Sequence, residues 1–321
     1  MGDGINVFDR NAGFAAGQEQ VWGFGKDTGI DSKSYLAPGA KIFYVDPNNT
    51  QATDTGNLGE DPTVPLATIQ YAVTNLVRDH MGDTIVVGAS DAWQYAPVTN
   101  RPTQITESVV IPSDKGGLRI VGAAPDPLGV PWSPAADNGV ALSIFAIDVL
   151  VEGFNFYTGL YSNCIGILAR WDSTDDEYGE NITVRNCFFD SSLDYGIQMD
   201  YSWFNQIYNN YFDEIAVAAI HSLDVEGDPD YCCIVNNRFM DCTAAIDLED
   251  TDYCFIHGNL IYGDGTGAAN FIDLNAGASG MVSDNWLSCT LAQYPVTCLD
   301  GGGTYIWVNN HCIDGDTVAN A

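Results

Sequence analysis

Short stretches of alternating apolar and polar residues recur along the second half of the chain, at intervals of about 22 to 33 residues. Each stretch opens on an aliphatic residue, in the series Val151, Val184, Ile207, Ile234, Ile256, Val282 and Val308. Five residues later each stretch places a second apolar residue, in the series Phe156, Phe189, Phe212, Phe239, Ile261, Leu287 and Ile313. The stretches lack a helical period, so the pattern predicts short strands that stack coil upon coil in a parallel β-solenoid.

An asparagine stands three residues after the opening aliphatic residue in four successive stretches. These residues are Asn210, Asn237, Asn259 and Asn285. A side-chain amide both donates and accepts hydrogen bonds, so we expect each amide to bond to the amide of the next coil and to turn backbone. The aromatic positions Phe189, Phe212 and Phe239 are expected to form a second internal stack beside this asparagine ladder.

The combination of aliphatic, aromatic and asparagine stacks resembles the right-handed parallel β-helix of the pectin-lyase-like superfamily, including its members from viruses and phages. The resemblance implies an all-β fold whose solenoid covers residues 42–313, followed by a tail at 314–321. It is specific for fold and much less specific for function, because one fold carries many activities.

The beginning of the solenoid shows a different period. Leu66, Ile69, Val73 and Leu76 recur at helical spacing, and Gly82 follows as a stop signal. This pattern predicts an α-helix at about 66–80 that caps the open end of the coil, where the core and the strand edges would otherwise be exposed. The first strands are expected at 84–87, 108–111 and 118–121.

Residues 1–41 are rich in glycine and show no repeat, so we interpret them as an extended N-terminal arm. The arm carries four aromatic residues, Phe8, Phe14, Trp22 and Phe24. Two arrangements are open: the arm packs back along its own solenoid, or its aromatic residues dock on a neighbouring subunit of a larger assembly.

The chain has 43 acidic and 11 basic residues among 321, a formal net charge of −32. Binding to nucleic acid or to an anionic membrane demands a cationic surface, so neither is expected as a partner. No apolar run reaches the length of a membrane span, and the first residues do not form a basic, apolar leader. Of nine cysteines, Cys232 and Cys254 share one column, which favours inward, reduced thiols and synthesis in a cytoplasm.

The second strand of each coil supplies an outward polar column, read as Gln198, His221, Asp247, Asp273 and Asp300. Asp247 and Glu249 lie two residues apart on one strand, which places their carboxyl groups at roughly 6–7 Å on one face. That separation suits the acid and base of an inverting glycosidase, so Asp247, Glu249 and Asp273 are the candidate catalytic residues if the protein is an enzyme. The alternative is a solvated or cation-bridged acidic surface.

An acidic loop supplies the candidate metal ligands Asp172, Asp175, Asp176 and Glu177. Carboxylates are ligands that Ca²⁺ prefers, but the spacing does not match an EF-hand loop, and a solvated turn is the alternative. No other cofactor is expected.

Taken with the resemblance, these features predict a noncatalytic structural component of a virus particle, most simply a phage head-decoration or fibre-like protein. We expect it on the virion surface after synthesis in the host cytoplasm, attached to other capsid subunits through its arm and associated as a homotrimer. Two alternatives remain open: a polysaccharide depolymerase of the tailspike type, and a noncatalytic glycan-binding module, either of which would be extracellular. The second would use outward aromatic residues such as Tyr195, Tyr201, Trp203 and Trp286.

Overall fold

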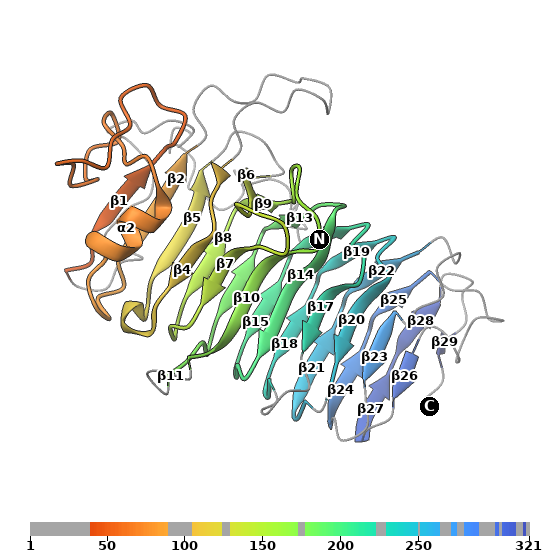
Figure 1. The fold of residues 1–321 in the computed structure, drawn as a ribbon. Helices are drawn as coiled ribbons and strands as arrows, with labels where there is room; N and C mark the ends of the chain where they lie inside the picture. The colour runs from red at the N-terminus through yellow and green to blue at the C-terminus, as the bar shows by residue number, and fades with distance from the viewer. Residues whose placement is uncertain are drawn as a thin grey trace, which may run out of the picture.

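The computed structural model describes residues 39–88, 105–123, 129–172, 177–222, 229–249, 251–263, 271–274, 279–288, 299–301, 304–312 and 317–318. These residues form a parallel β-solenoid, in which three sheets run side by side along the molecule (Figure 1). We call them sheets A, B and C. Within these ranges no helix is both long enough and apolar enough to cross a membrane.

Each sheet stacks the corresponding strands of successive coils. Sheet A contains β1 (Ile42–Val45), β2 (Thr84–Gly88), β5 (Arg119–Ala123), β8 (Leu150–Glu152), β12 (Thr183–Arg185), β15 (Gln206–Tyr208), β18 (Cys233–Val235), β21 (Cys254–His257), β24 (Ser279–Ser283) and β27 (Thr304–Val308). Sheet B contains β3 (Ile105–Thr106), β6 (Val130–Ser133), β9 (Phe154–Phe156), β13 (Phe188–Phe189), β16 (Tyr211–Asp213), β19 (Arg238–Met240), β22 (Leu260–Tyr262), β25 (Trp286–Leu287), β28 (Asn310–Cys312) and β29 (Thr317–Val318). Sheet C contains β4 (Val109–Ile111), β7 (Val140–Ile144), β10 (Cys164–Asp172), β14 (Leu193–Asp200), β17 (Ala218–Ser222), β20 (Ala244–Leu248), β23 (Ile272–Leu274) and β26 (Leu299–Gly301), with β11 (Glu177–Tyr178) attached to β10.

The chain visits sheets A, B and C in that order and then returns to sheet A one coil further on. Strands of neighbouring coils pair in parallel, whereas β10–β11 and β28–β29 pair antiparallel. The register brings like residues together: Val184 is opposite Ile207, and Phe189 is opposite Phe212. The predicted stacking of the apolar columns is therefore confirmed for these coils.

The aromatic column forms a continuous stack inside the solenoid. Phe189 and Phe212 have ring centroids 4.6 Å apart with planes 8° from parallel, and Phe212 and Phe239 follow at 4.9 Å and 7°. All three side chains are buried. Offset aromatic pairs of this kind contribute about 0.5–1.5 kcal/mol each beyond the burial of apolar area.

Two glycines of sheet C make room for this stack. A Cβ atom on Gly196 would lie 2.8 Å from the ring of Phe212 and 2.6 Å from a backbone oxygen of Ala219. Gly166, one coil earlier, has the same relation to Phe189. Close approach of ring and backbone therefore explains glycine at both positions.

The predicted asparagine ladder is present and is one residue longer than expected, because Asn310 continues it. Each amide donates to the side-chain oxygen of the next asparagine, as from Asn237 Nδ2 to Asn259 Oδ1 at 3.2 Å. The same Nδ2 donates to a backbone oxygen of sheet A, that of Ile207 for Asn237, at 2.8 Å. The backbone N–H of each asparagine also donates to the next side-chain oxygen. Buried polar groups are thus paired along the whole ladder.

The last coil departs from the predicted columns by one residue. Val282 is opposite Trp307, which is buried, whereas Val308 is exposed. Leu287 is likewise opposite Cys312, so the prediction that Val308 opens this stretch was wrong by one position. The larger indole of Trp307 fills the core where the preceding coils have an aliphatic side chain.

An α-helix, α2, spans Ile69–Asn75 and is shorter than the predicted 66–80. The Thr68 side chain accepts a hydrogen bond from the Tyr71 N–H, which satisfies one unpaired donor at the helix start. Ile69, Ala72 and Val73 are buried, and the helix packs on β1, β2 and β4. A 3₁₀ turn at Ser113–Lys115 follows β4. The role of α2 as a cap stays a prediction.

The early strands lie within a residue or two of the predicted 84–87, 108–111 and 118–121. Of the cysteines whose side chains the structure describes, Cys164, Cys187, Cys232, Cys242 and Cys254 are buried free thiols. The contact with Cys254, together with burial, raises the pKa of the Cys232 thiol. The predicted arm, with Phe8, Phe14, Trp22 and Phe24, lies outside the described residues.

The ladder generates a stability prediction. Replacing Asn237 with alanine removes one donor to the backbone oxygen of Ile207 and takes the side-chain acceptor from the buried N–H and Nδ2 of Asn210. Each unpaired group costs about 1–3 kcal/mol, so we expect Asn237→Ala to lower the free energy of unfolding by about 3 kcal/mol in urea titrations.

The matched control is the neighbouring Asn236, whose side chain is exposed and whose φ is 55°. Glycine accepts this backbone conformation, so Asn236→Gly should change stability by less than about 1 kcal/mol. Equal losses in the two variants would show that the ladder adds nothing to stability.

Candidate functional site

The outward polar column of sheet C is present in the predicted register. Gln198 is opposite His221, His221 opposite Asp247, Asp247 opposite Asp273, and Asp273 opposite Asp300. The residues that precede them in each strand, such as Ile197, Ile220 and Ile246, belong to the core. Side chains alternate between the faces of a strand, so the column lies on the outer face.

Two members of this outer column are nevertheless buried. Gln198 is 6% exposed and His221 is 9% exposed, whereas Asp247 and Asp273 are partly exposed. The Tyr195 ring stacks on His221 with centroids 4.9 Å apart. Burial and the nearby carboxylates of Asp194 and Asp247 raise the pKa of Tyr195, which disfavours the phenolate beside these carboxylates.

His221 also approaches the next carboxylate of the column. Its Nδ1 lies 3.2 Å from Asp247 Oδ2 but makes no hydrogen bond of normal geometry. Gln198 Oε1 is likewise buried without a hydrogen-bond partner. Buried polar atoms left without a partner are costly, so ordered water, or a ligand that reaches these two atoms after a side-chain shift, would stabilise the column.

Of the three predicted catalytic residues, the structure places Asp247 and Asp273 side by side on neighbouring strands. Glu249 follows directly after β20, where its N–H donates to Ser222 Oγ at 2.7 Å. The side chain of Asp300 lies outside the described part of the structure. The register of Asp247 and Asp273 agrees with the sequence prediction. The separation of the Asp247 and Glu249 carboxyl groups, and the catalytic role of all three residues, stay predictions.

A second feature was missed in the sequence: an exposed aromatic ladder in the turn that leads from sheet C to sheet A. Phe204, Tyr231 and Tyr253 occupy the same turn position in successive coils. Their rings stack with centroids 5.0 and 4.9 Å apart. The predicted columns came from the strands alone, although these three aromatic residues recur at one fixed offset before them.

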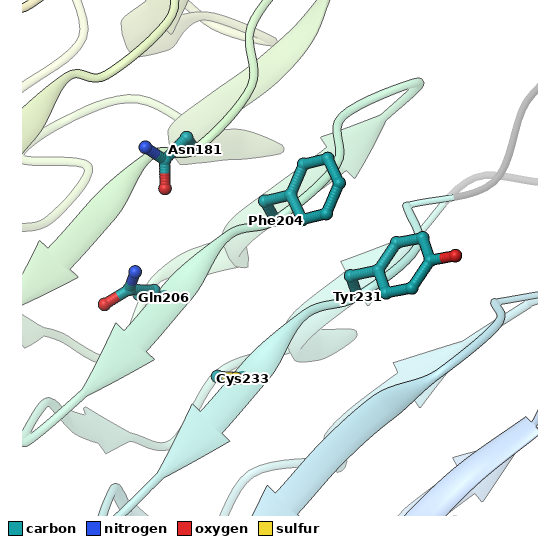
Figure 2. A pocket seen from close by; sticks show the side chains of 5 residues that line it. All are labelled: Asn181, Phe204, Gln206, Tyr231 and Cys233. Carbon is teal, nitrogen blue, oxygen red and sulfur yellow. The ribbon is translucent and has the colours of Figure 1, made fainter.

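An open hollow of about 480 Å³ lies beside this ladder, lined by Asn181, Phe204, Gln206, Tyr231 and Cys233. Figure 2 shows Phe204 between Asn181 and Tyr231, with Gln206 and Cys233 below on the adjoining strands β15 and β18. The volume is in the range of small-ligand pockets.

The other aromatic residues considered for glycan binding lie in separate places. Tyr201 and Trp203 pack with Trp171 and Tyr178 where β11 folds against β10, with ring centroids 5.0 to 6.1 Å apart. Trp286 is exposed on sheet B and packs on His311.

Only part of the predicted calcium loop lies within the residues that the structure describes. Asp175 and Asp176 lie outside the described residues, and Asp172 and Glu177 pair across the β10–β11 ladder, with side chains that the structure does not describe. Among the residues that it does describe, no group of three His, Cys, Asp or Glu side chains is arranged to hold a metal ion.

No protein-family model matches the chain, and no curated protein matches it in sequence.

Proposed function

We propose that the protein is a glycan-binding β-solenoid and that the outer face of sheet C around Gln198 and His221 binds the sugar. One observation supports this proposal above the others: Gln198 Oε1 and His221 Nδ1 are buried, make no hydrogen bond of normal geometry and belong to one polar column, in which His221 Nδ1 lies 3.2 Å from Asp247 Oδ2. Sugar hydroxyl groups both donate and accept, so a glycan along the column can satisfy both atoms once the neighbouring side chains shift to admit it.

The charge of the column selects among glycans. Asp247 and Asp273 continue it on the next two coils, and the whole chain carries a net charge of −32. Like charges repel, so an acidic polysaccharide is disfavoured, whereas a neutral or amino-bearing glycan is accepted. An amino group beside Asp247 and Asp273 would add a charge-assisted hydrogen bond.

Binding of glycan oligomers tests this site. We expect titration calorimetry to show that the hexamer of glucosamine binds more tightly than the hexamer of N-acetylglucosamine, because its amino groups are charged. The double variant Gln198→Leu, His221→Phe keeps the apolar shape and removes two hydrogen-bonding groups, so it should bind about tenfold more weakly.

The control for this pair is Gln51→Leu, which removes an exposed amide from the loop after β1. Its affinity should match that of the wild type. Wild-type affinity in the double variant would refute binding at sheet C.

Hydrolysis is the second candidate function, favoured by the pairing of Asp247 with Asp273. Neighbouring strands lie about 4.8 Å apart, close to the roughly 5–5.5 Å between the carboxyl groups of retaining glycosidases. Asp247 with Glu249 offers the longer separation of the inverting type. In either case, His221 beside Asp247 acts as a positioning residue for that carboxylate.

The hydrolytic candidate predicts that Asp247→Asn abolishes the release of reducing ends from a glycan that the wild type cleaves. Asparagine preserves the size of the side chain but neither donates a proton nor attacks as a carboxylate. Circular dichroism of the variant should match the wild type. Unchanged turnover by a folded Asp247→Asn protein would exclude this assignment.

We also propose that the solenoid is right-handed and pectin-lyase-like. We further propose that the protein is a trimeric surface component of a virus particle. Parallel crossover connections are right-handed in nearly all proteins, which supports the hand. Exposed apolar residues support the association of subunits, because Met281 and Ile306 are paired neighbours on the outside of sheet A. The arm would add contacts to other capsid subunits.

Native mass measured by light scattering tests the association. We expect the full chain to have the mass of three chains, and Ile306→Asp to reduce it to that of one, because a buried unpaired charge opposes the contact. Leu160→Asp alters an exposed leucine in a loop and is the control that should remain trimeric. A wild-type protein with the mass of one chain would contradict the trimer.

A further inference from the structure

The turn from sheet C to sheet A repeats one unusual backbone conformation in five coils. Asp148, Asn181, Phe204, Tyr231 and Tyr253 have φ between 51° and 59°. The turn is held by hydrogen bonds between coils, such as Phe204 N–H to Asp230 O at 2.9 Å. Asn and Asp tolerate this left-handed conformation, whereas for other side chains it costs roughly 1–2 kcal/mol.

The three aromatic residues are therefore not the choice that folding alone would favour. Asn181 makes the same turn one coil before Phe204 without that strain. Stacking offsets part of the strain, but the side chains remain 50%, 46% and 62% exposed for Phe204, Tyr231 and Tyr253. Backbone strain combined with exposed aromatic surface is typical of residues kept for binding.

The hollow lies where this ladder lacks a ring. Tyr231 covers one face of Phe204, and on the opposite side the coil contributes the small amide of Asn181 instead of an aromatic side chain. Coils repeat about every 4.8 Å, so the gap beside Phe204 has about the depth of one stacked ring. A flat or chair-shaped ring with one apolar face fits this space.

The polar groups of the hollow are amides. Asn181 Nδ2 donates to Asp148 Oδ1 at 2.5 Å, which leaves Asn181 Oδ1 as an acceptor. The side chain of Gln206 is exposed and can both donate and accept. All five lining residues are uncharged, in a chain whose net charge is −32. The lining therefore suits an uncharged ring bearing hydroxyl groups and offers nothing to neutralise an anion.

We propose that this hollow is a binding site for a neutral hexopyranose unit of a glycan. The apolar face of the sugar stacks on Phe204, and the amides of Asn181 and Gln206 bond to its hydroxyl groups. The site is separate from the sheet C column and does not rest on it. A neutral sugar here would hold a chain along the edge between sheets C and A.

The test uses two neutral probes, cellohexaose and maltohexaose, with hexagalacturonic acid as the charged comparison. We expect the wild type to bind at least one neutral hexamer and to bind the acidic one more weakly. Phe204→Asn removes the ring but keeps a residue suited to the turn, so the fold should persist and the affinity should fall about tenfold.

Tyr253→Asn is the matched control, because it removes a ring from the far end of the same ladder, outside the hollow. Its affinity for the neutral hexamer should stay within about twofold of the wild type, as for a site without shared contacts. Equal losses in the two variants would overturn the placement of the sugar beside Phe204.

Cys233 offers a second measurement inside the hollow. Its thiol is partly exposed, and burial is the main cause that raises its pKa, so it should react slowly with a maleimide at pH 8. The neutral hexamer should slow this reaction, as followed by mass spectrometry of the Cys233 peptide, in the wild type but not in Phe204→Asn. Protection should persist in the Gln198→Leu, His221→Phe variant, which separates this site from sheet C.

Two results would overturn the proposal. The first is a wild type that binds neither neutral hexamer at millimolar concentration. The second is a Phe204→Asn variant whose affinity and Cys233 protection equal those of the wild type.

Discussion

The structure depends on the register between neighbouring coils, and buried asparagine amides hold that register. Each side-chain oxygen from Asn210 to Asn310 accepts from the preceding coil, at a backbone N–H and, from Asn237 onward, also at the preceding asparagine amide. A slip of one residue would break every such bond and turn the apolar face of each strand outward. The ladder therefore opposes slippage more strongly than apolar contacts alone, which have no direction.

Fixed register turns a repeat in the sequence into columns in space. The phenylalanine stack follows from it, as do the polar column of sheet C and the aromatic ladder in the turns. A side chain in such a column lies about 4.8 Å from its counterpart in the next coil. A residue type that recurs in a column therefore places several equivalent groups close together. Carboxylates at Asp247 and Asp273 concentrate negative charge, while rings at Phe204 and Tyr231 make a continuous aromatic surface.

Much of the fold was predictable, because the strands repeat with the same offsets between aliphatic, asparagine and aromatic positions. The prediction failed at the last coil, where Trp307 takes the inward position assigned to Val308. Both residues are apolar, so the pattern alone did not separate them, although Asn310 lies three residues after Trp307 and would have identified the correct register. The helix was predicted too long because apolar spacing continues through Leu76 and Val77, after regular helix has ended at Asn75.

The candidate sites were likewise predictable only in part from the sequence. The order of residues in the sheet C column followed from the strands, but the burial of Gln198 and His221 did not, because an outward side chain in a solenoid is normally solvated. The left-handed turn at Phe204, Tyr231 and Tyr253 was also missed, because aromatic residues give no turn signal. The available clue was an aromatic residue three positions before the opening aliphatic residue in three successive coils: Phe204 before Ile207, Tyr231 before Ile234 and Tyr253 before Ile256.

Hydrogen exchange measured residue by residue tests the register most directly. The account predicts that the backbone N–H groups of Cys187, Asn210, Asn237, Asn259 and Asn285, which donate to asparagine side chains, exchange as slowly as the central strand amides. Exchange of these groups at the rate of exposed loop amides would contradict an asparagine ladder that holds the coils in register.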